Sequence, residues 1–162
     1  MNNAEHYYKV SVKWEADRRG TLSSPILNQE IEVATPPEFP KGIEGVWSPE
    51  HLFVASVNSC LMTTFLSIAE NSKLEYLGFE SKAIGKLEIV DGKYMISEIT
   101  IVPIVTVIDK ASEAKAEKVL QKAEANCLIS NSVKSKIHFL PEIKIAEVRT
   151  VEMSNVDYEG IF

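Results

Sequence analysis

The chain has 162 residues, of which 45% are hydrophobic and 25% are charged, an ordinary balance for a globular protein. This length suits one domain with a sizeable core, spanning residues 1–162. The net charge of −6, without a cluster of lysine or arginine, argues against a nucleic-acid partner. The N-terminus has neither a basic start nor an apolar run, so no secretory signal is visible and a cytoplasmic location is expected.

The first quarter of the chain, about residues 7–34, is predicted to form strands. Apolar residues of the first strand alternate with polar ones and share one face: Tyr8, Val10, Val12 and Trp14. Residues 15–20 are polar and end in glycine, which indicates a turn. Two more strands are expected near residues 21–26 and 30–34. A loop follows at residues 35–47, where three prolines exclude a helix or a central strand.

A long helix is predicted over residues 48–71. Ser48 can cap it, Pro49 suits its first position, and Glu50 complements the positive helix end. The segment would be roughly 35 Å long at 1.5 Å per residue. Because it carries almost no charge, we expect it to be buried on most sides, by a sheet or by a second subunit. A membrane span is the competing interpretation, disfavoured by polar residues within the run: Ser56, Asn58, Ser59, Thr63, Thr64 and Ser67.

Two strands are predicted within residues 77–108, joined by a turn at Asp91 and Gly92, a pair typical of tight hairpins. Pro103 indicates an edge position or a bulge in the second strand.

A second helix, about residues 110–127, is capped by Asp109 and places Cys127 on its inward face. A last strand is expected at residues 143–151, before a tail of weak pattern at 152–162. The order of elements predicts an α+β fold with helices packed on antiparallel sheet.

The two cysteines, Cys60 and Cys127, stand 67 positions apart. Without visible export the compartment is reducing, where paired cysteines are more often redox-active than structural. Their spacing lacks the short-range Cys or His partners of a zinc site, so no metal and no bound cofactor is expected. Cys60 shares one helical stripe with Phe53 and Val57 and with three hydroxyl residues that could supply hydrogen-bond donors: Ser56, Thr64 and Ser67. The alternative is that both cysteines simply fill the core, a common use of the residue.

Three segments of the chain resemble the OsmC/Ohr family of thiol-dependent hydroperoxide reductases. They are the run from Trp47 through Ser48-Pro49-Glu50-His51 to Asn58-Ser59-Cys60, the run Ala125-Asn126-Cys127-Leu128-Ile129-Ser130, and the turn Arg18-Arg19-Gly20. Together they span most of the chain, and their combination is more specific than any one of them. The resemblance implies an OsmC-like fold, in which antiparallel sheets pack around long central helices in an intertwined homodimer.

The resemblance also implies a function, the reduction of organic hydroperoxides, and of hydrogen peroxide as a further candidate, to alcohols in oxidative-stress defence. Cys60 would be the peroxidatic thiol and Cys127 the resolving thiol, joined in a disulfide during turnover. Arg18 would stabilise the Cys60 thiolate and Glu50 would hold that arginine, with Arg19 as the second candidate. An external dithiol, of lipoyl type in this family, would reduce the disulfide.

One geometric constraint limits this interpretation. Glu50 and Cys60 lie ten residues apart, which is ~15 Å on a straight helix, so they meet only if the helix breaks or a second subunit contributes. Asn58 and Ser59, which replace the small residues common in the family, are the expected break.

Leu128 departs from the proline that usually follows the resolving cysteine in the family. This departure favours the alternative function, a non-catalytic binding or stress protein with inert cysteines. A redox sensor is a third hypothesis, but no DNA-binding element supports it. His51 and His138 are expected to be solvated surface residues.

Overall fold

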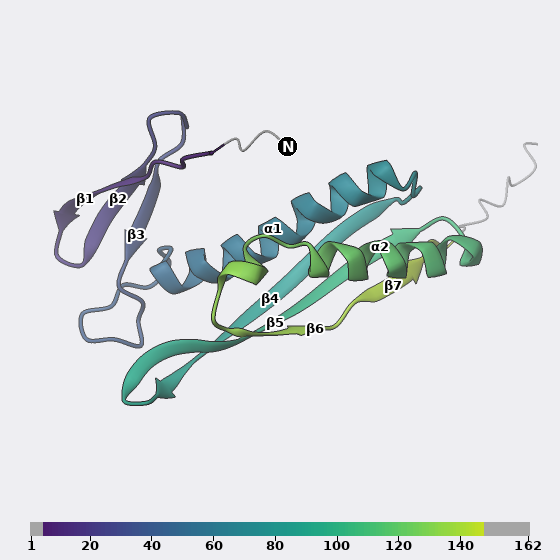
Figure 1. Cartoon of the computed structure of the whole chain (residues 1–162). Helices are drawn as coiled ribbons and strands as arrows, with labels where there is room; N and C mark the ends of the chain where they lie inside the picture. The colour runs from purple at the N-terminus through teal and green to yellow at the C-terminus, as the bar shows by residue number, and fades with distance from the viewer. Residues whose placement is uncertain (1–4, 148–162) are drawn as a thin grey trace, which may run out of the picture.

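The computed structural model describes residues 5–147, which form two sheets and two long helices (Figure 1). The small sheet is antiparallel and contains β1 (Ser11–Ala16), β2 (Arg19–Ser23) and β3 (Ile31–Ala34). The main body contains α1 (Pro49–Asn71), β4 (Gly78–Val90), β5 (Lys93–Val107), α2 (Glu113–Ala125), β6 (Lys136–Phe139) and β7 (Glu142–Ile145). The predicted α+β class is confirmed.

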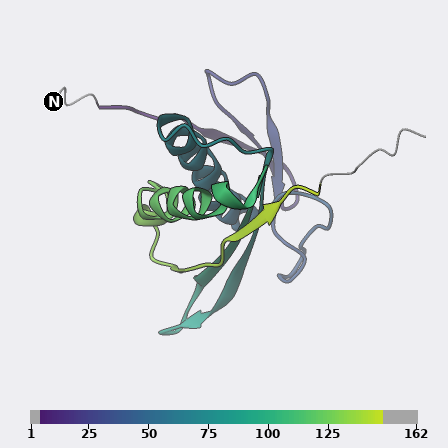
Figure 2. The ribbon, with the colours of Figure 1, turned by 90° about the vertical axis from the view of Figure 1, so that its right-hand side faces the viewer.

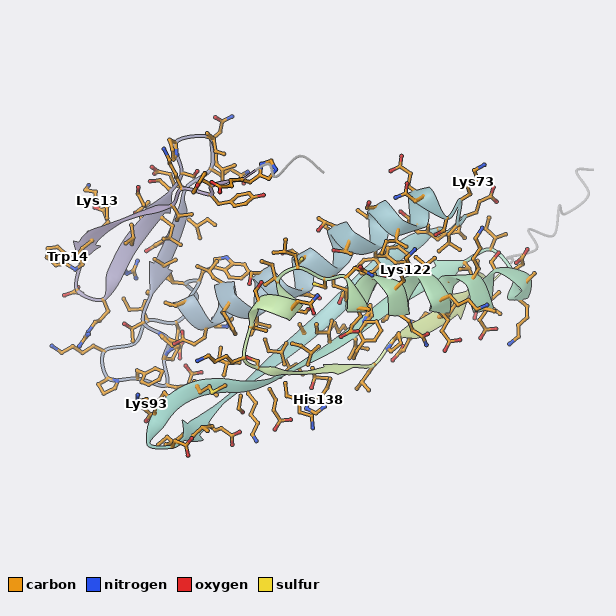
Figure 3. All side chains as sticks on the ribbon, in the orientation of Figure 1. Lys13, Trp14, Lys73, Lys93, Lys122 and His138 are labelled. Carbon is orange, nitrogen blue, oxygen red and sulfur yellow. The ribbon has the colours of Figure 1, made fainter. Side chains whose placement is uncertain are left out.

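The small sheet stands apart from the main body and joins it through the loop that precedes α1 (Figure 1). Its turn is tighter than predicted, because β1 continues to Ala16 and Asp17 takes a left-handed conformation with φ of 46°. The predicted alternation of apolar residues is present, yet nothing in the described part of the chain covers that face. Trp14, for example, is 72% exposed and projects from the end of β1 (Figure 3).

Helix α1 begins as predicted, because the Ser48 hydroxyl accepts a hydrogen bond from the His51 N–H at 3.2 Å and Pro49 opens the first turn. One stripe of the helix is buried in the core: Val57, Leu61, Phe65 and Ala69. The expectation of burial on most sides is not met within one chain. Met62 and Leu66, which lie about 100° around the helix from the buried stripe, are each 39% exposed.

Among the described residues, α1 is the one helix that is long and apolar enough to span a membrane. Length and composition alone do not distinguish such a span from a core helix. Four residues of α1 fill the core, and hydroxyl groups interrupt its other faces.

Strands β4 and β5 form the predicted hairpin. Asp91 and Gly92 both have positive φ, 50° and 75°, as the tightest two-residue hairpin turns require. Gly85 on β4 lies directly beneath α1, where a Cβ atom would come within 2.5 Å of the Val54 side chain. The missing side chain therefore lets the helix approach the sheet closely.

The larger sheet is not wholly antiparallel, because β6 and β7 both pair with β5 in parallel. Helix α2 provides the crossover connection that parallel pairing requires, and both helices cover the same face of the sheet (Figure 2). Strand β7 corresponds to the start of the strand predicted at residues 143–151. Strand β6 was not predicted. Residues 148–162, which include the predicted tail, lie outside the described part of the chain.

Pro103 is neither at an edge nor at a bulge, so that prediction was wrong. β5 is a central strand, and the side chain of Pro103 is fully buried. The proline is tolerated because β6 pairs with residues 98–101 and β7 with residues 104–107. Pro103 falls in the gap between these two partners, where a ladder N–H is not needed.

The second helix is shorter than predicted. Asp109 accepts a hydrogen bond from the Ser112 N–H at 2.9 Å, and one 3₁₀ turn at Lys110–Ser112 precedes α2. The predicted inward stripe is buried: Ala116, Val119, Leu120 and Ala123. Cys127 lies two residues beyond the helix end instead of on it, yet it is fully buried in the same core.

His138, predicted to be solvated, lies on the outer face of the larger sheet (Figure 3) and is half-buried. Its Nε2 atom is 2.5 Å from a carboxylate oxygen of Glu98, which also pairs with Lys86. This pairing ties β6 to the two strands of the hairpin.

Leu61→Ala should destabilise the protein by about 2–5 kcal/mol, because Leu61 is 1% exposed and its removal leaves a cavity beneath α1. Urea unfolding at one fixed protein concentration measures this change. The matched control is Glu117→Ala on the exposed face of α2, expected within about 0.5 kcal/mol of the parent. Equal losses in the two variants would contradict the assignment of the core.

Candidate active site

Cys60 lies in the middle of α1 and is half-buried. Its Sγ atom accepts a hydrogen bond from the Ile129 N–H at 3.4 Å. The Thr64 hydroxyl, one helical turn further along, lies 4.0 Å from the same sulfur atom. Cys60 therefore faces the segment that follows α2, although 69 positions separate it from Ile129.

Cys127 is brought to Cys60 by the way in which α2 ends. The Cys127 N–H donates to the Glu124 carbonyl at 3.1 Å, and the Cys127 carbonyl accepts from the Asn131 N–H at 3.0 Å. These bonds form a compact turn that carries Cys127 into the core and Ile129 onto the Cys60 sulfur. Both cysteines are free, and they are close enough for each thiol to influence the pKa of the other.

The two thiols differ in pKa. Partial burial by itself raises the pKa of Cys60, but four hydrogen-bond partners outweigh it and lower that pKa below its ordinary value: the Ile129 N–H, Cys127, Thr64 and the Leu128 N–H. Burial raises the pKa of Cys127. Hydrogen bonds from Ser130 offset part of this effect, and the neighbouring Cys60 adds to it. At a given pH, a larger fraction of Cys60 than of Cys127 is therefore in the thiolate form.

A shallow cavity of about 380 Å³ lies between α1 and α2, and Thr64, which contacts the Cys60 sulfur, is part of its lining. Five of its six lining residues carry a polar group: Thr63, Thr64, Ser67, Lys122 and Asn126, with Ile68 as the sixth residue. Lys122 projects from the exposed side of α2 (Figure 3).

Glu50 lies at the start of α1, where two larger cavities of about 500 and 890 Å³ both reach its side chain and Phe39. One carboxylate oxygen, Oε2, is buried without a hydrogen-bond partner among the described residues. Such an atom is costly to leave unpaired, so the side chain is suited to a partner that the described residues of one chain do not supply.

The structure does not bring Arg18 to Cys60 or to Glu50 within one chain. Arg18 lies in the exposed turn between β1 and β2, and no ion pair of its guanidinium is present in the described part. Arg19 is engaged locally, with its guanidinium 2.7 Å from the Glu32 carboxylate across the β2–β3 pair.

The predicted break in α1 at Asn58 and Ser59 was wrong, because the helix is continuous from Pro49 to Asn71. The Asn58 side chain instead exchanges hydrogen bonds with Ser81 on β4, and the Ser59 hydroxyl donates to the Ala55 carbonyl. Both polar side chains thus find partners without interrupting the helix. Glu50 and Cys60 therefore stay ~15 Å apart along one rigid helix.

His51 is exposed, as predicted, but its Nδ1 atom is 2.8 Å from the Ser48 hydroxyl. Ser48 is fully buried, so this contact reinforces the helix cap and does not present a nucleophile. Among residues 5–147, no group of three or more His, Cys, Asp and Glu side chains is placed to share a metal ion.

Sequence reasoning gave no role to two groups at the site, the Ile129 N–H and Ser130. The Ile129 contribution is a backbone group, which no residue pattern reveals. Ser130 could have been found only from its position three residues after Cys127.

Fold and site together define a two-cysteine α+β protein with one thiol on α1 and the other in the turn after α2. Comparison with known proteins assigns the family: the OsmC-like protein family model matches residues 42–142, and the chain belongs to that family. The matched range contains Glu50, Cys60 and Cys127, and Arg18 lies outside it.

Three relatives illustrate the likeness. The uncharacterized protein YmaD of Bacillus subtilis (strain 168) is 25% identical over 147 residues, covering 88% of this chain and 96% of its own. An OsmC-like protein of unknown function from Vibrio cholerae is 25% identical with a TM-score of 0.73, covering 86% of this chain and 99% of its own. An organic hydroperoxide resistance protein from Elizabethkingia anophelis shares the fold at 17% identity and a TM-score of 0.71, covering 89% and 99%.

Iodoacetamide at neutral pH should modify Cys60 roughly tenfold faster than Cys127 or more, because only the thiolate reacts and Cys127 is buried with a raised pKa. The Cys60 rate should level off at a lower pH than that of an ordinary thiol, while the Cys127 rate should still be rising. Peptide mass spectrometry separates the two residues. In urea the two rates should converge, and a Cys127 that reacts first in the folded protein would contradict the assignment.

Proposed function

We propose that this protein is a cysteine-based peroxidase that reduces organic hydroperoxides to alcohols in oxidative-stress defence. The observation that carries the proposal is the proximity of the two thiols. The Cys60 sulfur accepts a hydrogen bond from the Ile129 N–H, and Ile129 lies only two residues beyond Cys127. Membership of a family that includes organic hydroperoxide resistance proteins supports it.

In the first step the Cys60 thiolate attacks the terminal peroxide oxygen. The O–O bond breaks, an S–O bond forms, and the departing alkoxide takes a proton to leave as the alcohol. Cys60 is thereby oxidised to a sulfenic acid. The lowered pKa of Cys60 supports this role because it increases the fraction of attacking thiolate.

In the second step the Cys127 sulfur attacks the sulfenic sulfur. A disulfide forms, and the hydroxyl group leaves with a proton as water. A dithiol of lipoyl type then reduces the disulfide and becomes a disulfide itself. The need for a dithiol supports our proposal of a reducing compartment such as the cytoplasm, and the proposed cycle requires no bound cofactor.

The proposal includes a homodimer in which Arg18 of one chain reaches the site of the other. Three features of the single chain support it. Glu50 holds a buried carboxylate oxygen without a partner among the described residues, Arg18 lies exposed on a sheet that stands apart from its own main body, and the two charges are opposite. A guanidinium beside Glu50 would satisfy that oxygen.

Unpaired edges support the same assembly. β4 is 13 residues long and forms one edge of the larger sheet, with Ile84 72% exposed. β1 is likewise an edge strand with apolar side chains in solvent. Long apolar edges of this kind are usually covered, and a second copy of the chain would cover them.

Cys60→Ser should abolish consumption of cumene hydroperoxide in the presence of dihydrolipoamide, because serine supplies no nucleophile of comparable ionisation. Cys127→Ser should retain one fast turnover and then stop, since the sulfenic acid cannot be resolved. Peroxide loss and trapping of the sulfenic acid by dimedone measure the two effects. Unchanged turnover in Cys60→Ser would remove Cys60 from the mechanism and favour a non-catalytic binding protein.

Arg18→Ala should lower turnover about tenfold or more, because loss of a cation near a thiolate raises the thiol pKa by a unit or more. Arg19→Ala is the matched control, since its exposed pair with Glu32 contributes little. Steady-state kinetics and light scattering of both variants test the role and the dimer. A loss confined to Arg19→Ala would transfer the role to Arg19.

A further inference from the structure

The Cys60 sulfur receives two contacts from groups to which the peroxidase proposal assigns no chemical role in turnover. One is the Ile129 N–H at 3.4 Å, and the other is the Thr64 hydroxyl at 4.0 Å. The Thr64 hydroxyl belongs to α1 and the Ile129 N–H belongs to the turn after α2, so two separate elements contact the sulfur. Within the described part of one chain no arginine takes their place.

The Thr64 hydroxyl differs from its neighbours on α1. A hydroxyl inside a helix usually donates to a carbonyl three or four residues earlier. The other hydroxyls close to Cys60 do so: Ser56 to Phe53, Ser59 to Ala55, and Thr63 to the carbonyl of Cys60 itself. For Thr64 the contact present in the described part of the chain is the one with the Cys60 sulfur.

We propose that Thr64 stabilises the Cys60 thiolate by donating its hydroxyl hydrogen to Sγ, and that the Ile129 N–H completes a two-donor cradle. A thiolate is a better acceptor than a thiol, so donors aimed at it favour the charged form. Two neutral donors do this without placing a fixed charge next to Cys127. The lowered pKa of Cys60 agrees with both contacts.

The cradle also holds the sulfur in place. Ile129 belongs to the same turn as Cys127, so its hydrogen bond ties the Cys60 sulfur to the segment that carries the second thiol. Thr64 contacts the sulfur from within α1, and it also lines the 380 Å³ cavity between α1 and α2. The function of this cradle in turnover rests on the proposed peroxidase activity, but its effect on ionisation does not.

Thr64→Val removes the hydroxyl and keeps the shape of the side chain. The pH profile of Cys60 alkylation should shift to higher pH by roughly 0.5–1 unit, which lowers the rate at pH 7 by about 3- to 10-fold. Thr64→Ser should restore the parent profile. Thr63→Val is the matched control, with the same change one position earlier and a hydroxyl bonded to a carbonyl instead of the sulfur, and its profile should stay unchanged.

Identical profiles for the parent, Thr64→Val and Thr63→Val would overturn the proposal. Equal shifts in Thr64→Val and Thr63→Val would also overturn it, since the effect would then belong to the helix and not to the contact. Circular dichroism checks that Thr64→Val is folded, and Thr64→Ala decides the question if it is not.

Failure of this inference can be separated from failure of the proposed function, because alkylation needs no peroxide. A shifted profile in Thr64→Val with an inactive parent would sustain the cradle and reject the peroxidase. An active parent with no shift would reject the cradle alone.

Discussion

The candidate site depends on one long-range contact, the hydrogen bond from the Ile129 N–H to the Cys60 sulfur. It joins the middle of α1 to the turn after α2, and both segments rest on the same face of the larger sheet. The close packing of α1 above Gly85 and the buried stripe of α2 hold the two segments at this separation. Without that packing nothing would hold the two thiols near each other.

Local signals in the sequence were sufficient to predict where an element begins or turns when a few neighbouring residues determine that position. Ser48 and Pro49 start α1, and Asp91 with Gly92 turns the hairpin, because cap and turn chemistry act over a few residues. β6 and β7 are four residues each and owe their conformation to β5, so their own sequence carries little signal. Pro103 was misjudged for the same reason, since its environment is set by where two other strands begin and end.

The site could be predicted in part. The two cysteines were identified from residue type and motif, and the structure brings them together. The end of α2 was misplaced by two residues, so Cys127 was assigned to the helix and not to the turn that positions it. The break expected in α1 was inferred from the need to bring Glu50 to Cys60, but Asn58 has a hydrogen-bonding partner on β4 that the sequence could not reveal.

Within residues 5–147 of one chain, several groups lack the surroundings that they require. Glu50 buries a carboxylate oxygen with no partner among the described residues, α1 exposes a second apolar stripe, and both sheets have open edges. Scattered apolar residues in solvent are ordinary on a monomer. Here they coincide with the orphaned carboxylate oxygen and the open edges, and together these features describe a surface that a further polypeptide would complete.

The parallel pairing of β5 with β6 and β7 has a consequence for the order of folding. The β4–β5 hairpin closes through a two-residue turn, whereas the parallel strands dock only after the whole α2 crossover has been synthesised. During synthesis on the ribosome, therefore, Cys60 emerges long before its companion sulfur, and the nascent chain passes through a stage with a solitary thiol. Under the proposed mechanism, a Cys60 oxidised at that stage would lack its second thiol, so the newly made polypeptide would be more vulnerable to oxidation than the finished molecule.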